Sequence, residues 1–479
     1  MAGSTIQRSM LSLLLLLLLL FGDDGGVNCM EEKQILLLPK SQARKPTRTP
    51  RCSSQRSRSE KDATMLEMRH HDSSFRTTKI NRDDKVEKLL YSDESRVRSI
   101  QSQRNRVVST KTEQQSESEM PLGSGIKLQT MNYIVTIELG GQKMSVIVDT
   151  GSDITWVQCQ PCRYCYNQQD PLFNPTLSPT FHSILCNSSI CASLQFATGN
   201  LGFCRINGKN CNYNVNYGDG SYTDGELSLE QLKLGDTTVQ NFVFGCGQRN
   251  HGLFGGVSGL MGLGRSRLSL VSQTLAEFGG VFSYCLPSEE NLSGSLILGA
   301  NLSAFRNSTP ISYTRIVSNP QMPTFYFLNF TGASVGGIPL QAPGFAKGVT
   351  LIDSGTVITR LVPSVYKAVR DEFLKQFSGY PSAPGFSILD TCFNLTGYSE
   401  VDIPNLRLHF EGGTEVKVDV SGMFYFVRKD ASQVCLALAS LSSEDEIAII
   451  GNYQQKNLRV VYNGKDSELG FAEENCRYS

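Results

Sequence analysis

The sequence predicts a mostly β protein made of two related lobes with a cleft between them. Over residues 126–479, short runs rich in β-branched and aromatic residues alternate with Gly-rich turns, and helical patterns are few. A hydrophobic run that ends in Asp-Thr-Gly-Ser at residues 149–152 returns as Asp-Ser-Gly-Thr at 353–356. Because neighbouring motifs repeat in the same order, we interpret the chain as an internal duplication in which each half contributes one Asp.

The first element along the chain is a secretory signal over residues 1–26. Arg8 supplies a positive start, 10–21 is a Leu-rich apolar run, and the small residues Gly25 and Gly26 follow. A helix of about twelve residues spans only about 18 Å, whereas the bilayer core is about 30 Å thick. No later segment is long and apolar enough to cross a membrane, so the sequence predicts an exported protein without a membrane span.

Residues 27–125 form a basic segment, called the leader below. It holds 20 Lys and Arg against 14 Asp and Glu, a balance of +6, whereas residues 126–479 hold 24 against 29, a balance of −5. Few apolar residues over 40–61 predict a largely disordered leader, with one polar helix over 86–100 and ordered structure beginning near Met131. A basic leader is typical either of a pro-segment that docks on an acidic enzyme or of nucleic-acid binding.

The two lobes are expected at residues 126–318 and 319–479. Strand patterns at 133–139 and 144–148, joined by a Gly-containing turn, predict a hairpin that leads into the first Asp motif. Residues 318–324 look like the crossing between lobes, after which a new strand series reaches the second Asp motif.

Two helices are predicted within the lobes. One covers residues 268–278, and the other covers 363–377 with Pro363 in its first turn, where proline is favourable.

The repeated Asp motif indicates acid/base chemistry. Asp149 and Asp353, one from each half, would be close enough to share a proton if the halves face each other. One such motif alone is a common capped turn, whereas two with matched flanks favour a shared site.

With these motifs the chain resembles the pepsin-like aspartic proteases over roughly residues 130–479. Trp156 lies seven residues after Asp149, and Tyr217 opens a Tyr-Gly-Asp-Gly-Ser segment similar to the family's mobile flap. Apolar-apolar-Gly segments at 260–262 and 449–451 follow the two Asp motifs. The cysteine cluster between Trp156 and Tyr217 resembles the nepenthesin-type plant branch, and the basic leader with Gly-Leu-Gly-Arg from residue 262 resembles the chloroplast nucleoid DNA-binding subgroup.

The resemblance implies a role for each motif residue. Asp149 and Asp353 would be catalytic, and the glycine in each motif would let backbone approach the pair closely or adopt unusual dihedral angles. The Ser354 position often carries Thr in the family, so one methyl group is lost there. The supporting residues are Thr150 and Ser354 as cross-braces, Gly151 and Gly355 for close approach, Ser152 and Thr356 as hydrogen-bond donors to the outer carboxylate oxygens, and Tyr217, Gly218 and Trp156 for the flap and substrate.

The cysteines predict disulfides. Of 14 cysteines, Cys29 and Cys52 lie in the leader, and an even twelve remain behind a signal segment. The resemblance implies a Cys392–Cys435 pair, and the sequence leaves the other connectivities open. Three cysteines at 159, 162 and 165 also fit a zinc site, but no His lies among them and an oxidising route favours disulfides. We therefore expect no metal and no cofactor.

Two further residue types bear on function. The histidines after the leader, at 182, 251 and 409, lie in no recognisable nucleophile context. Six acceptor patterns for N-glycosylation fit export, at Asn187, Asn291, Asn301, Asn307, Asn329 and Asn394.

The sequence therefore predicts a secreted, monomeric aspartic endopeptidase that binds polypeptide substrates extended in its cleft and its own leader as an inhibitor. Ile147 and Ile352 beside the Asp motifs suggest a preference for apolar residues at the cleaved bond. The expected location is extracellular, the apoplast, with vacuole and plastid left open. Two alternatives stay: a protease-like binding protein such as a glycosidase inhibitor, and a protease that binds nucleic acid through its leader.

Overall fold

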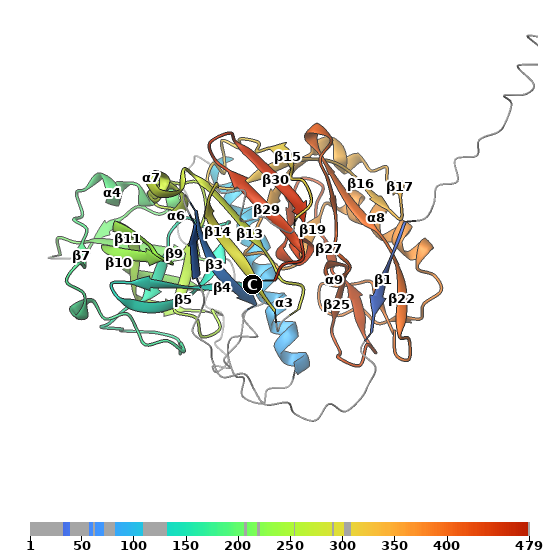
Figure 1. The fold of residues 1–479 in the computed structure, drawn as a ribbon, viewed down its shortest axis with the longest axis horizontal. Helices are drawn as coiled ribbons and strands as arrows, with labels where there is room; N and C mark the ends of the chain where they lie inside the picture. The colour runs from blue at the N-terminus through green and yellow to red at the C-terminus, as the bar shows by residue number, and fades with distance from the viewer. Residues whose placement is uncertain are drawn as a thin grey trace, which may run out of the picture.

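The computed structural model describes residues 32–38, 57–60, 63–70, 82–108, 132–205, 208–217, 221–252, 254–289, 292–300 and 308–477. The signal segment, Cys29 and Cys52 lie outside this set. Within it, the molecule is mostly β, with two groups of strands on either side of a central region, as predicted (Figure 1). No helix among the described residues is long and apolar enough to cross a membrane.

The leader and the first lobe supply the elements up to residue 315. The leader elements are β1 Lys33–Leu37, β2 Ser57–Glu60, β3 Ala63–His70 and α3 Arg82–Val108. The first lobe contributes β4 Tyr133–Leu139, β5 Gln142–Asp149, β6 Trp156–Gln158, η1 Pro175–Leu177, β7 His182–Ser183, α4 Ser189–Ala192, α5 Leu194–Thr198, β8 Phe203–Cys204, β9 Cys211–Asn216, β10 Tyr222–Leu234, β11 Thr237–His251, β12 Gly259–Gly262, α6 Leu270–Gln273, α7 Leu275–Phe278, β13 Val281–Cys285, β14 Ser293–Gly299 and β15 Ser312–Arg315.

The second part of the chain supplies the remaining elements. They are β16 Phe327–Val335, β17 Ile338–Pro339, η3 Pro343–Lys347, β18 Val349–Ile352, β19 Thr359–Leu361, α8 Pro363–Gln376, β20 Ser382–Ala383, β21 Cys392–Phe393, β22 Glu400–Pro404, β23 Leu406–Phe410, η4 Glu411–Gly413, β24 Glu415–Lys417, α9 Val420–Met423, β25 Phe424–Phe426, β26 Val434–Leu436, β27 Leu438–Ser440, β28 Ala448–Ile450, η5 Asn452–Gln455, β29 Leu458–Asn463 and β30 Glu468–Glu473.

The two Asp motifs sit in matching strand arrangements. β5, which ends at Asp149, pairs in parallel with β12, and β18, which leads to Asp353, pairs in parallel with β28. β12 and β28 are the apolar-apolar-Gly segments of the sequence pattern. The strand that follows each motif pairs antiparallel with the same partner. β6 pairs with β12 in the first half, and β19 pairs with β28 in the second. The internal duplication is therefore visible in the hydrogen bonding of the sheets.

The leader contains more structure than the sequence predicted. Ordered structure was expected to begin near Met131, yet β1 pairs antiparallel with β22, and β3 lies between β14 and β4. Helix α3 is longer than the expected 86–100 and runs through the middle of the molecule (Figure 1). The physical reason is that strands and core surfaces far away in the sequence supply the hydrogen bonds and apolar contacts that leader composition alone does not reveal.

The last strands, β29 and β30, pair with β13 and β15, so one sheet contains strands from both halves of the chain. One expectation within the lobes needs correction. The helix expected over 268–278 is two short helices, α6 and α7, because Thr274 between them leaves the helical conformation at φ −114° and ψ 26°. Helix α8 and the β4–β5 hairpin form as predicted.

Candidate active site

Asp149 and Asp353 come together at the centre of the molecule. Asp149 is the last residue of β5, and Asp353 follows β18 directly. Both side chains are fully buried, at 0% exposure. Each strand is a buried hydrophobic run, so it carries its carboxyl group into the interior at the strand end. The structure thus places the two predicted carboxylates, one from each half, in a single site.

Hydrogen bonds brace the two motif loops against each other. The N–H of Thr150 donates to Ser354 Oγ at 3.1 Å, and the N–H of Ser354 donates to Thr150 Oγ1 at 3.0 Å. Ser354 Oγ in turn donates to the carbonyl oxygen of Val148 at 3.1 Å. The hydroxyl is the group that makes these bonds, so Ser serves as well as Thr at position 354. This reciprocal pairing fixes the relative position of the two carboxyl groups.

The carboxylate oxygens are held by nearby donors. The N–H of Gly151 donates to Asp149 Oδ1 at 3.0 Å, and the N–H of Gly355 donates to Asp353 Oδ1 at 2.9 Å. Thr356 Oγ1 donates to Asp353 Oδ2 at 2.6 Å. Ser152, expected to do the same for Asp149, acts to lower the pKa of that carboxyl, but its buried Oγ does not reach the geometry of a regular hydrogen bond. The two halves are therefore not equivalent at this position.

The motif glycines allow the two loops to approach closely. A Cβ atom on Gly355 would lie 2.3 Å from Asp149 Oδ1, and one on Gly151 would lie 2.7 Å from Asp353 Oδ1. Both distances are far inside van der Waals contact. Neither glycine has a positive φ. Their requirement is the close approach of the opposite carboxylate rather than an unusual dihedral angle.

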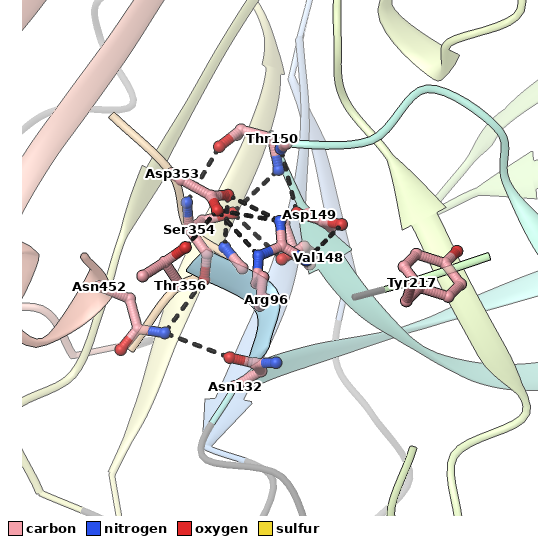
Figure 2. A network of polar contacts seen from close by, with 12 residues as sticks. Arg96, Asn132, Val148, Asp149, Thr150, Tyr217, Asp353, Ser354, Thr356 and Asn452 are labelled. Atoms are coloured by element: carbon pink, nitrogen blue, oxygen red, sulfur yellow. Dashed lines mark hydrogen bonds and ion pairs between the residues drawn. The ribbon is translucent and has the colours of Figure 1, made fainter. Parts of the chain in front are cut away.

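Arg96 of helix α3 occupies the space between the two carboxyl groups. Its Nη2 atom lies 2.7 Å from Asp149 Oδ1, and its Nε lies 2.9 Å from Asp353 Oδ2 (Figure 2). A guanidinium group has five donors in a planar fork, which suits two facing carboxylates. Sequence reasoning missed this residue, because nothing in the spacing of the leader distinguishes Arg96 from its other basic residues.

The charges at the site shift one another's pKa values. Burial raises the pKa of Asp149, and the nearby Asp353 adds to that effect although Arg96 acts against both. Burial would also raise the pKa of Asp353, but Arg96, Thr356 and the N–H of Gly355 together bring it below its usual range. The two carboxyls therefore differ, with Asp353 the more readily ionised. Burial would lower the pKa of Arg96, but the two carboxylates more than reverse this, so the guanidinium is charged.

The predicted flap residues lie apart from the carboxyl pair. Trp156 is fully buried, and its Nε1 donates to the hydroxyl of Tyr217 at 2.9 Å. Phe254 packs edge-on against both rings, with centroid distances of 5.0 and 5.6 Å. Figure 2 shows Tyr217 on the Asp149 side of the site. Gly218 lies outside the described residues. Tyr217 thus takes its position from Trp156 and Phe254.

Apolar residues beside the motifs do not inform on the cleaved bond. Ile147 and Ile352 are 3% and 0% exposed and belong to two separate clusters of the hydrophobic core. The expectation of an apolar preference from these two residues therefore loses its basis.

All twelve cysteines after the leader form disulfides in the structure. The pairs are Cys159–Cys246, Cys162–Cys165, Cys186–Cys204, Cys191–Cys211, Cys285–Cys476 and Cys392–Cys435. The last of these is the pair that the resemblance implied. The sulfurs considered for zinc are engaged in the first two, so they are not thiolates that could bind a metal ion.

The remaining sequence candidates lie away from the site. Asn187 and Asn394 are exposed, and Asn329 is half-buried in β16, whereas Asn291, Asn301 and Asn307 lie outside the described residues. His182 is exposed, and His251 and His409 are half-buried.

Comparison with known proteins decides the family. The family models described as xylanase inhibitor N-terminal and C-terminal match residues 133–300 and 325–473. An aspartyl protease family protein of Arabidopsis thaliana is 44% identical, covering 81% of this chain and 82% of that protein. The chain belongs to the plant aspartyl protease family. It is therefore an aspartic-type peptidase, with aspartic proteinase nepenthesin-1 of Nepenthes gracilis 36% identical over 72% of this chain and 78% of that one.

Solved structures with the same fold are more distant. The basic 7S globulin from soybean has a TM-score of 0.56 at 20% identity, covering 72% of this chain and 91% of that chain. Conglutin gamma from lupine seeds has a TM-score of 0.57 at 17% identity, covering 71% and 91%. At these identities the likeness supports the fold and no more, and this aspartyl protease shares with them its mostly β architecture of two lobes.

Proposed function

We propose that this aspartyl protease is made as a secreted precursor and cleaves polypeptides at acidic pH with Asp149 and Asp353 as a catalytic pair. One ionised carboxyl takes a proton from water as the water oxygen bonds to the scissile carbonyl carbon, and the protonated partner gives its proton to the carbonyl oxygen. The first carboxyl then passes its proton to the leaving nitrogen as the C–N bond breaks, and the former carbonyl oxygen returns a proton to the partner. This is the general scheme for aspartic proteases. The observation that carries the proposal is the pair of buried, differently ionised carboxyls braced at 3.0–3.1 Å through Thr150 and Ser354.

We expect hydrolysis of denatured protein at about pH 4, within an acidic optimum of roughly pH 2–5.5, because the pair works only when it holds one proton. A statine-type inhibitor should abolish the cleavage, and a metal chelator should leave it unchanged. The measurement is a digest of a denatured protein at pH 4 and pH 7 with and without each compound. A neutral optimum with no activity at pH 4 contradicts this environment for the pair.

The alternative of an inhibitor-like binding protein has one observation behind it, the description of the matching family models. The same digest separates the two, because a binding protein without catalysis would cleave nothing at any pH. Nucleic-acid binding by the leader stays a prediction, and salt-sensitive DNA retention that requires residues 27–125 would support it.

We further propose that the leader keeps the precursor latent. Arg96 fills the space between the carboxyl groups, and hydrogen bonds of α3 hold the helix in place on both sides of it. Downstream, the Gln101 amide donates to the carbonyl oxygen of Ile447 and accepts from its N–H, both at 2.8 Å. Leu90, Val97 and Ile100 bury apolar surface against the lobes. A substrate cannot reach the pair while this helix is docked.

We expect the leader to be released as pH falls. The cation of Arg96 acts to lower the pKa of both carboxyls and brings that of Asp353 below its usual range, whereas burial keeps the pKa of Asp149 raised. A carboxyl whose pKa is lowered by docking stabilises the docked leader at any pH above the ordinary pKa of a carboxyl. This stabilisation is lost as the pH falls through the pKa of the docked state. Burial raises the pKa of Asp93 on the same helix, which acts in the opposite sense. The proposed release therefore rests on the pair between Arg96 and Asp353, which weakens as Asp353 takes up a proton.

The measurement is the N-terminal sequence of purified precursor after incubation at pH 4 and pH 7. We expect processing at pH 4, with the cut roughly between residues 106 and 127, and a stable precursor at pH 7. Wild-type precursor that stays intact for hours at pH 4 contradicts the electrostatic release. If an Asp149→Asn precursor is processed equally fast, another protease makes the cut.

A further inference from the structure

The chain just after Asp353 makes a second buried contact with the leader. The leader residue in this contact is Asp93, which is an anion. The Asp93 carboxylate accepts hydrogen bonds from the N–H groups of Val357 and Ile358 at 2.5 and 3.2 Å. Its Oδ2 atom also accepts from Arg360 Nη2 at 3.0 Å. The side chains of Asp93 and Arg360 are each only 1% exposed. The enzyme part of the chain thus holds one guanidinium and two backbone donors around a single carboxylate.

Arg360 relies on the leader for its anionic partners. The second of them is Glu94, also on α3, whose Oε2 lies 3.3 Å from Arg360 Nη2. Within the enzyme part, the guanidinium donates to the carbonyl oxygen of Ile358 at 2.8 Å. Among the described residues outside the leader, no carboxylate lies within ion-pair distance of Arg360. Because an arginine side chain stays protonated at any pH of interest, departure of the leader leaves a positive charge without a counter-ion beside the catalytic pair.

We propose that Arg360, with the N–H groups of Val357 and Ile358, forms a subsite of the mature enzyme for the carboxylate of an Asp or Glu side chain in the substrate. The inference rests on the proposed function, because the leader must leave and a polypeptide must enter. Asp93 stands in for the substrate carboxylate. A guanidinium fork and two convergent N–H groups match a carboxylate in charge and in number of donors. Arg360 thereby becomes a residue that determines specificity.

The position of the subsite follows from the helix. Asp93 precedes Arg96 by three residues, which is about 4.5 Å along a helix axis. An extended substrate rises about 3.3 Å per residue, so this distance corresponds to roughly one to two residues. The preferred acidic residue should therefore lie within about three positions of the cleaved bond, on the side of the substrate that passes the loop 357–360.

The test compares matched peptide substrates with processed enzyme at about pH 5, above the ordinary Glu pKa of about 4.3. Each pair carries Glu or Gln at one of the three positions on either side of the cleaved bond. At one position we expect kcat/KM to be about tenfold or more higher for Glu, the size expected for hydrogen bonds to a charged group. Arg360→Gln should bring this ratio close to one, and Arg360→Lys should leave an intermediate ratio.

Arg315→Gln is the matched control, because Arg315 is exposed and pairs with Glu411 away from the site. It should keep the wild-type ratio. A ratio near one at every position, or an unchanged ratio in Arg360→Gln, overturns the subsite while cleavage of both peptides leaves the proposed function standing. Failure to cleave any peptide overturns the proposed function instead.

A binding measurement gives a result without turnover and without an Arg360 variant. A synthetic peptide of residues 82–108 is titrated into processed enzyme near pH 7, in its natural form and with Asp93→Asn. We expect the Asn form to bind about tenfold or more weakly. Equal affinities would overturn the subsite even if the enzyme proved inactive toward every peptide.

Discussion

Replacing either carboxyl of the proposed catalytic pair by its amide should reduce peptide hydrolysis at least a hundredfold, the order of magnitude that one general acid or base contributes. Asp149→Asn and Asp353→Asn preserve the size of the side chain, but neither amide can exchange the proton that the pair must share. Because each half of the molecule supplies one carboxyl, the two variants should lose activity to a similar extent. The measurement is kcat/KM at about pH 4 on processed enzyme, with thermal unfolding recorded to show that the fold persists.

Asp371→Asn is a suitable control, since Asp371 is an exposed residue of α8 that pairs with Lys367 on the same helix. It should behave as wild type. If purified Asp353→Asn protein keeps a tenth of wild-type activity, a mechanism that shares one proton between Asp149 and Asp353 is wrong for this enzyme.

Removing Arg96 should end the latency of the precursor. In Arg96→Ala the two carboxyls lose a partner that is only 21% exposed, and breaking a buried ion pair costs about 3–5 kcal/mol. That cost corresponds to leader docking weakened by more than about a hundredfold. The precursor should then bind an immobilised statine-type inhibitor near neutral pH, with the uncut chain visible in the bound fraction.

Arg98→Ala supplies the comparison from the same helix. Arg98 is 71% exposed and pairs with Glu94 at 3.3 Å, a surface contact that contributes little. Both variants remove one positive charge from the leader, so a general effect of charge would affect them equally. If the immobilised inhibitor retains the Arg98→Ala precursor as well as the Arg96→Ala precursor, the guanidinium between the carboxyls has no specific role.

The positions of the two Asp motifs could be predicted from sequence because the features that mark them are local. Each Asp follows its own hydrophobic strand, and its hydroxyl and glycine neighbours stand within three residues. The same motif in each half supports the interpretation of the other. Each motif strand also pairs with an apolar-apolar-Gly strand. Close approach at Gly151 and Gly355 was expected from the sequence, but its cause needed the structure, since a Cβ atom at either position would meet the opposite carboxylate and Arg96.

The leader could not be predicted in the same way, since its structure depends on partners elsewhere in the chain. β1 pairs with a strand that begins at Glu400, and β3 pairs with one that begins at Ser293. The low content of apolar residues in the leader indicates that the leader has only a weak hydrophobic core of its own. This composition carries no information about the sheet edges that other parts of the protein leave open for pairing. Arg96 and Arg360 were missed for this reason, because the role proposed for each depends on a contact between the leader and the rest of the chain.

The insertion of β3 between β14 and β4 makes the leader part of the sheet as well as a cover for the site. Cutting the chain between α3 and β4 leaves that strand in place but turns it into a separate molecule. Before the cut, the covalent link to the rest of the chain fixes the effective concentration of the leader. After the cut, the fraction of enzyme that still binds a leader follows mass action. A concentrated solution of cut chains should therefore retain its leaders, and a dilute one should lose them. If release of the leader activates the enzyme as proposed, activation should depend on enzyme concentration as well as on pH.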